Sequence, residues 1–231
     1  MIKLFFNPAP NPLKIALFLE ETGLEYELAM VDNRLGDQHT AEFKSLNPNA
    51  KVPVIIDDGE VVFDSNAILL YLAEKTGCFL GGNSGAKRGE LLSWLMFVAS
   101  GVGPFSGQAV HFRHFAAGSN PYSVKRYDFE ARRHWQIIDE RLTDRPYMLG
   151  DEYSIVDMSV WGWGTRIPFM LGDDAMEEFP NLARLMDEID ARPAAQRANG
   201  LKDRHKFKEE MDEGAMRNMY PQIFAEEGKS N

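Results

Sequence analysis

Two neighbouring residues, Asp64 and Ser65, have side chains suited to a ligand that carries both a positive and a negative charge. Ser65 precedes an apolar helical repeat and is predicted to be the N-cap of that helix. The free N–H groups of a helix N-terminus attract a carboxylate, and the Asp64 carboxylate attracts an ammonium group. The alternative is that Ser65 caps the helix with no ligand bound, which the same N–H groups also allow.

The only cysteine of the chain, Cys78, excludes an internal disulfide, a Cys-x-x-Cys redox pair and a cysteine-based zinc site. Any thiol chemistry must therefore use a thiol that comes with a ligand. Cys78 follows Gly77 at a predicted helix end, where a small buried packing residue is expected. We predict that Cys78 lies outside the site and that the site holds no metal.

The first eighty residues predict an α/β unit with the order β-α-β-α-β-β-α. Residues 7–12 (NPAPNP) contain three prolines and predict a rigid loop, in which Asn11 either caps the helix that follows or donates its amide to a ligand. The dipeptide Asp58-Gly59 is a strong hairpin signal. The predicted strands are 2–6, 26–31, 52–56 and 61–63, and the predicted helices are 13–22, a short one around 43–46, and one from Ser65 to the glycine at 77.

A parallel strand pair joined to an antiparallel hairpin, with helices on both faces, is the thioredoxin arrangement. Pro53 falls at the entrance to the third strand, where a cis Val52–Pro53 bond would explain the proline. A trans proline at the first residue of a strand is the alternative.

After the glycine-rich residues 81–85, no segment shows the alternation of a strand, and an all-helical bundle is predicted. Ser154 and Asp157 have the spacing of a capping box. We expect a first domain at residues 1–80, a helical domain at 87–200 and a tail at 201–231. The tail is rich in charge but also carries apolar side chains, so a frayed terminus is the default expectation and a tail that folds over another part of the molecule is the alternative.

The charge and the apolar runs limit the classes of partner. The formal net charge of −10 opposes binding to many phosphates, so nucleic acid is excluded as a partner. The apolar stretches are far shorter than the roughly 20 residues of a membrane-spanning helix. Residues 1–6 read as a strand rather than a signal peptide, so no membrane partner and a cytoplasmic location are expected.

These features together resemble the cytosolic glutathione transferases, and the details are most similar to the bacterial Nu class, whose members act as glutathione-dependent disulfide reductases. The resemblance covers Met1 to about Pro193 and rests on the loop at 7–12, the Asn-Ala-Lys-Val-Pro turn at 49–53, Asp64-Ser65, the segment 108–112 (QAVHF) and Arg133. The chain departs from the family at Ala9, where a threonine is usual.

The resemblance implies glutathione as co-substrate and a homodimer. It assigns the γ-glutamyl end of glutathione to Asp64 and Ser65, the cysteinyl backbone to Val52 beside the cis-proline Pro53, and the glycine carboxylate to Gln38 and Lys51. Asn11 becomes the catalytic residue, whose amide lowers the pKa of the glutathione thiol. Arg133 would bind the carboxylate of a second glutathione or of an acidic disulfide.

The function implied is thiol–disulfide exchange with glutathione as reductant, with peroxides as further oxidants. One alternative uses the same thiolate for conjugation to an electrophile or for ether cleavage. The other is a non-catalytic regulatory module, which the joint presence of Asp64, Ser65 and Val52-Pro53 argues against.

Overall fold

The computed structural model describes residues 1–82, 85–116 and 120–224. Its first part is a four-stranded sheet of order β2-β1-β3-β4, with β1 parallel to β2 and antiparallel to β3, and β3 antiparallel to β4. The strands are β1 (Ile2–Phe6), β2 (Tyr26–Met30), β3 (Val54–Asp57) and β4 (Glu60–Phe63), and the helices are α1 (Pro10–Thr22), α2 (Ala41–Leu46) and α3 (Ser65–Thr76). The predicted thioredoxin-like arrangement is confirmed.

Two predicted element boundaries beside prolines in this domain are wrong by two residues or more, and several others differ by one or two residues. Helix α1 begins at Pro10, inside the segment predicted as loop, because prolines are tolerated in the first helical turn, where backbone N–H groups have no intrahelical partner. Strand β3 begins at Val54 rather than Val52, and the preceding Pro53 has no N–H to donate to a strand ladder. The Val52–Pro53 peptide bond is cis.

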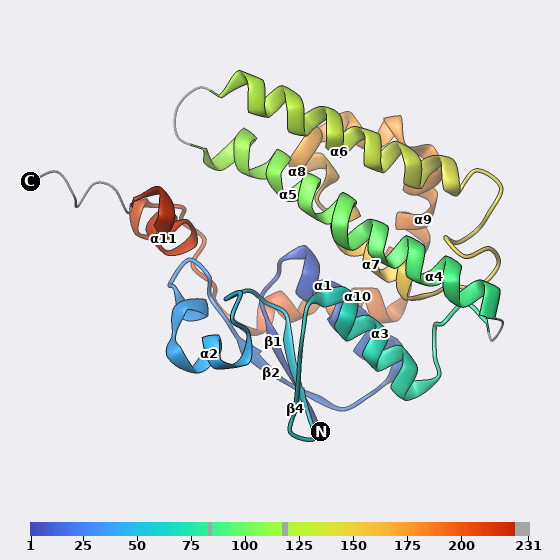
Figure 1. Ribbon diagram of the computed structural model, residues 1–231, viewed down its shortest axis with the longest axis horizontal. Helices are drawn as coiled ribbons and strands as arrows, with labels where there is room; N and C mark the ends of the chain where they lie inside the picture. The colour runs from blue at the N-terminus through green and yellow to red at the C-terminus, as the bar shows by residue number, and fades with distance from the viewer. Residues whose placement is uncertain (83–84, 117–119, 225–231) are drawn as a thin grey trace, which may run out of the picture.

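The second part is helical, as predicted (Figure 1). Figure 1 shows α4, α5 and α6 as long neighbouring helices on the side of the molecule away from the sheet, and α7 and α10 nearer to α1. The α-helices are α4 (Gly85–Phe97), α5 (Gly103–Val110), α6 (Pro121–Arg141), α7 (Ile155–Gly164), α8 (Ile167–Leu171), α9 (Pro180–Asp190), α10 (Pro193–Gly200) and α11 (Glu213–Met219), and π-helical turns at Val98–Val102 and His111–Phe115 flank α5.

The two parts share one apolar core through α1, which packs against both α7 and α10. Gly162 makes the α1–α7 contact possible, since a Cβ there would lie 2.7 Å from the carbonyl oxygen of Pro10. The predicted capping box of α7 is confirmed: the Ser154 hydroxyl accepts from Val156 N, and Asp157 accepts from the Ser154 backbone N–H at 2.9 Å. The close contact between α7 and α1 at Gly162 determines the position of the helical part relative to the first domain.

The expectation of a frayed tail is wrong for its described part. Lys208 donates its backbone N–H to the Asp32 carboxylate at 2.6 Å, and Arg34 donates to the carbonyl oxygen of Lys208. Asn218 donates its side-chain amide to the Arg34 carbonyl oxygen at 2.8 Å. Figure 1 places α11 beside α2 at the outer end of the first domain. Residues 205–224 are therefore held against the connection that follows β2.

Residues 83–84 of the predicted glycine-rich linker, and residues 225–231 of the predicted tail, lie outside the described residues. Gly85, which we placed in the linker, belongs to α4.

Candidate functional site

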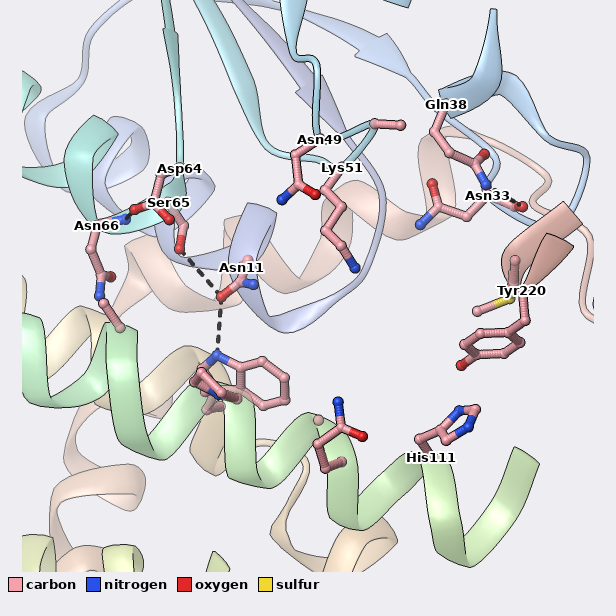
Figure 2. Close-up of a pocket in the computed structure, with 18 of the residues that line it drawn as sticks. Asn11, Asn33, Gln38, Asn49, Lys51, Asp64, Ser65, Asn66, His111 and Tyr220 are labelled. Carbon is pink, nitrogen blue, oxygen red and sulfur yellow. Dashed lines mark hydrogen bonds between the residues drawn. The ribbon is translucent and has the colours of Figure 1, made fainter. Parts of the chain in front are cut away.

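A cavity of about 740 Å³ lies between the sheet domain and the helical domain. The first domain lines it with residues at the start of α1, at the start of α3 and in the turn at 49–51, and the second domain lines it with α5 and Trp163. Residues 219–222 of the tail border one end, where Figure 2 shows Tyr220 facing His111. The cavity thus has walls from three parts of the chain.

Asn11 lies in the first turn of α1 and faces this cavity. Its carbonyl oxygen Oδ1 accepts two hydrogen bonds, from Trp163 Nε1 at 3.0 Å and from Ser65 Oγ at 3.3 Å (Figure 2). The alternative in which Asn11 caps the helix does not hold, since Ala9 is the N-cap residue and no side chain caps this helix. With Oδ1 occupied, the amide nitrogen of Asn11 is the group left to donate to a ligand.

Asp64, not Ser65, is the N-cap of α3, which corrects our prediction by one residue. Asp64 Oδ1 accepts the backbone N–H groups of Asn66 at 2.9 Å and of Ala67 at 3.1 Å. The backbone of Asp64 has a φ of 72°, a left-handed conformation that Asp tolerates better than most residues. Ser65 is the first helical residue, and both residues line the cavity as predicted.

Lys14 is a site residue that sequence reasoning missed. Its side chain is 1% exposed, and its ammonium donates to Ser65 Oγ and to Asn66 Oδ1, each at 3.2 Å. Burial lowers the pKa of Lys14 to about 7, and the negative charge of Asp64 acts in the opposite direction. The sequence feature that could have pointed to Lys14 is its position as a lone lysine among the apolar residues of helix α1. Because Ser65 Oγ accepts a hydrogen bond from Lys14, the Ser65 hydroxyl can donate its proton to Asn11 Oδ1.

Gln38 and Lys51 also line the cavity, but only Lys51 has a cation directed into it (Figure 2). Gln38 is 4% exposed, and its Nε2 already donates to the carbonyl oxygens of Asn33 and Asn218. Its Oε1 is buried without a partner among the described residues, as is Asn33 Oδ1. Two orphaned acceptors in one cavity wall indicate room for a ligand or water that donates hydrogen bonds.

Val52 is buried next to Lys51 and is not part of the cavity lining. The Lys51 carbonyl oxygen accepts from Asn47 Nδ2 at 2.7 Å, which holds the turn in front of the cis bond.

The tail contributes further lining residues that the sequence did not reveal. The carbonyl oxygen of Asn218 accepts from Gln38 Nε2 and lies 2.7 Å from His39 Nε2. Tyr220 packs edge-on against the ring of His111, with 4.7 Å between the ring centres. Burial lowers the pKa of His111, which favours the neutral imidazole in this contact.

Two candidates lie away from the cavity. Arg133 does not line it, and its guanidinium donates to Glu130 of the same helix at 2.9 Å. Cys78 is also outside the cavity, as predicted, but it is exposed rather than buried, because it follows the end of α3 on the surface. Among residues 1–82, 85–116 and 120–224, no three His, Cys, Asp or Glu side chains gather as metal ligands do.

A thioredoxin-like domain, an all-helical domain and a polar cavity between them define the class of protein. Residues 1–74 match the glutathione S-transferase N-terminal domain, and residues 126–188 match the glutathione S-transferase C-terminal domain. The chain belongs to the glutathione S-transferase family, and the resemblance seen in the sequence is confirmed.

Three relatives show how close the similarity is. Disulfide-bond oxidoreductase YfcG of Escherichia coli is 40% identical over 205 residues, covering 86% of this chain and 94% of the relative. A glutathione transferase of Burkholderia graminis, solved with two glutathione molecules per subunit, has a TM-score of 0.82 and 38% identity, covering 88% and 89% of the two chains. One of Pseudomonas putida, solved with one glutathione disulfide per subunit, has a TM-score of 0.78 and 35% identity, covering 86% and 90%.

Proposed function

We propose that this chain binds glutathione in the cavity and uses its thiolate to reduce small or mixed disulfides. The observation that carries the proposal is the Asn11 amide, whose oxygen is held by Trp163 and Ser65 and whose nitrogen is left to donate to the sulfur. A thiolate is a better nucleophile and a stronger hydrogen-bond acceptor than a thiol. A donor such as the Asn11 amide therefore stabilises the thiolate more than the thiol and lowers the thiol pKa. The relatives named disulfide-bond oxidoreductases support the same chemistry.

The γ-glutamyl end of glutathione is assigned to the start of α3. Its carboxylate is assigned to the backbone N–H of Ser65 at the positive end of the helix, because the hydroxyl proton of Ser65 is donated to Asn11 Oδ1. Its ammonium is assigned to the Asp64 carboxylate. Because Asp64 Oδ1 already accepts two backbone N–H groups, Oδ2 is the oxygen that would bind the ligand. The buried Lys14 adds positive charge behind Ser65 and favours the same carboxylate.

The cysteinyl and glycine parts extend towards the other end of the cavity. The cysteinyl segment stays assigned to the backbone of Val52 beside the cis bond, in the manner of an added strand, although Val52 is buried next to Lys51 and does not itself line the cavity. Lys51 binds the glycine carboxylate, while the orphaned Gln38 Oε1 suits a ligand N–H. Gln38 would bind the carboxylate itself only after exchanging its bonds to the Asn33 and Asn218 carbonyl oxygens.

The reaction requires no protein nucleophile. The glutathione thiolate attacks one sulfur of the substrate disulfide, a mixed disulfide forms, and the other sulfur leaves as a thiolate that takes a proton from water. A second glutathione thiolate attacks the mixed disulfide, which gives glutathione disulfide and the second substrate thiol. Arg133 is not carried into this scheme, since its guanidinium is bound to Glu130 away from the cavity.

We also propose a homodimer in the cytoplasm. Exposed apolar side chains on the edge strand β4 (Val61, Phe63) and on α4 and α6 (Met96, Phe129) support a second copy as partner. The exposed free thiol of Cys78 suits a reducing compartment. No described helix is long and apolar enough to cross a membrane. Light scattering tests the dimer, and cell fractionation tests the location.

Calorimetry with reduced and oxidised glutathione, followed by a coupled assay of disulfide reduction, tests the main proposal. We expect binding of both ligands and turnover that falls at least tenfold in Asn11→Ala. Cys78→Ala is the control, and it keeps its activity because the thiol lies outside the cavity. Binding without disulfide reduction would favour conjugation or ether cleavage of an electrophile, and absence of binding would favour a regulatory module.

A further inference from the structure

A second cavity of about 490 Å³ adjoins the first one. The two share a wall made of Asn33, Gly107, Trp163 and Met219, so the second cavity opens on the far side of the residue that holds Asn11. Its remaining lining is largely apolar and comes from the loop at 8–10 and from Val110, Phe115, Phe169 and Phe207. A group bound here would lie next to the sulfur position assigned above.

Arg166 lines this apolar cavity and has no acidic partner among the described residues. It lies between α7 and α8, and its Nη2 donates to the Pro8 carbonyl oxygen at 2.5 Å. No acidic side chain of the described residues lies within ion-pairing distance of its guanidinium. Burial lowers the pKa of Arg166, and no neighbouring charge offsets that effect. A partly buried guanidinium has several N–H groups to satisfy, and one backbone carbonyl satisfies only one of them.

The other charged residues that line the cavity are already committed. Asp32 uses one carboxylate oxygen on the backbone N–H of Arg34 and the other on the backbone N–H of Lys208. The Arg34 guanidinium donates to the carbonyl oxygens of Lys208 and Glu209, and the Lys208 ammonium pairs with Asp212. Neither arginine of this cavity has a carboxylate partner, but Arg34 donates to two carbonyl oxygens and Arg166 to one, so Arg166 is the cation with fewer acceptors.

We propose that Arg166 binds a carboxylate on the substrate, and that the second cavity selects disulfides whose apolar, aromatic half carries that carboxylate. This inference rests on the proposed function and names its substrate class. The guanidinium fork binds the two carboxylate oxygens together, and the apolar walls pack against the ring. The glutathione thiolate then attacks the sulfur bonded to the ring at the shared wall. A mixed disulfide of glutathione and the aryl thiol forms as the substrate S–S bond breaks, and the other half of the substrate leaves as a thiolate; a second glutathione thiolate then releases the aryl thiol and gives glutathione disulfide.

The test compares dithiodibenzoic acid with its neutral dicarboxamide as substrates of the full-length protein. In wild type, kcat/KM for the acid exceeds that for the amide, and in Arg166→Gln the ratio of the two falls by about tenfold or more. Arg166→Lys keeps the positive charge but loses the two-pronged guanidinium, so the acid-to-amide ratio of kcat/KM falls less than in Arg166→Gln. Arg132→Gln is the matched control, because that guanidinium is paired with Asp128 and Glu178 and does not line the cavity. An unchanged ratio in both Arg166 variants would overturn the inference.

A second measurement separates this inference from the proposed function. Naphthoate is titrated into the protein with heat as the signal, in the absence of any disulfide. Weaker binding to Arg166→Gln than to wild type supports the anion site even if neither disulfide is reduced. Equal binding to both proteins, or no binding to wild type, rejects the site whatever the disulfide assay gives.

Discussion

Replacing Trp163 by Phe tests whether the direction of the Asn11 amide controls the glutathione thiol. The change removes the N–H that donates to Asn11 Oδ1 at 3.0 Å and leaves the weaker contact from Ser65 at 3.3 Å. A neutral hydrogen bond contributes about 1 kcal/mol, and a pKa change of one corresponds to about 1.4 kcal/mol. Trp163→Phe therefore raises the pKa of the bound thiol by up to about 0.7.

Removing the donor itself has a larger effect. A hydrogen bond to a charged group contributes about 1.5–3 kcal/mol, so Asn11→Ala raises the thiol pKa by about 1 to 2. Because Trp163 acts only through Asn11, the double variant should match Asn11→Ala alone. The measurement is the ultraviolet absorbance of bound glutathione against pH, with S-methylglutathione as the blank.

Trp161→Phe is the matched control for this prediction. Trp161 lies on the same helix, and its ring N–H donates to Asp190 at 2.8 Å, away from the cavity. Its loss lowers stability without moving the thiol pKa. If Trp163→Phe raised the thiol pKa equally in the presence and absence of the Asn11 amide, the orientation argument would be refuted.

Three further predictions concern stability and the tail. Asp157→Ala leaves the backbone N–H groups of Met148 and Ser154 without their acceptor and costs about 3 kcal/mol of unfolding free energy, measured by denaturant titration. Lys14 stays charged up to its ordinary pKa of 10.5 in the unfolded chain but only up to about 7 in the folded protein, so between these values the unfolded chain binds more protons. The free energy of unfolding of wild type therefore rises with pH across that window, by at most about 1.4 kcal/mol per pH unit. Thermal melts of Lys14→Met at several pH values should show a smaller rise of stability with pH. Ending the chain at Arg204 frees Arg34 and Gln38 from their tail carbonyls, and hydrogen exchange should then be faster at residues 32–39.

The sequence predicted the first domain well because its signals are local. The hairpin at Asp58-Gly59, the alternation in the strands and the glycines after helix ends each act within a few residues. The errors were also local. Proline was read as excluding a helix where it begins one at Pro10, and the capping role fell on Ser65 although the Asp64 carboxylate performs it.

The site was predictable only where the family resemblance supplied it or where a helix start marks it. The contact between Trp163 and Asn11 joins residues 152 positions apart, and the contact between Asn218 and Gln38 joins residues 180 apart. No periodicity or motif encodes such pairs, since they follow from how α7 packs on α1 and how the tail returns to the first domain. Arg166 was missed for the same reason, because its missing partner is visible only in three dimensions.

These distant contacts assign different tasks to the two domains. The first domain carries the groups that we propose to bind glutathione, namely Asn11, Asp64 and Ser65, which all line the first cavity. The helical domain fixes their direction: Gly162 lets α7 approach, Trp163 holds the Asn11 oxygen, and Arg166 holds the Pro8 carbonyl in the same loop. Since the wall that orients the donor also separates the two cavities, a change in domain packing alters thiol pKa and substrate choice together. If Asn11 activates the thiol as we propose, thiol activation is a property of the packed pair of domains rather than of the thioredoxin-like fold alone.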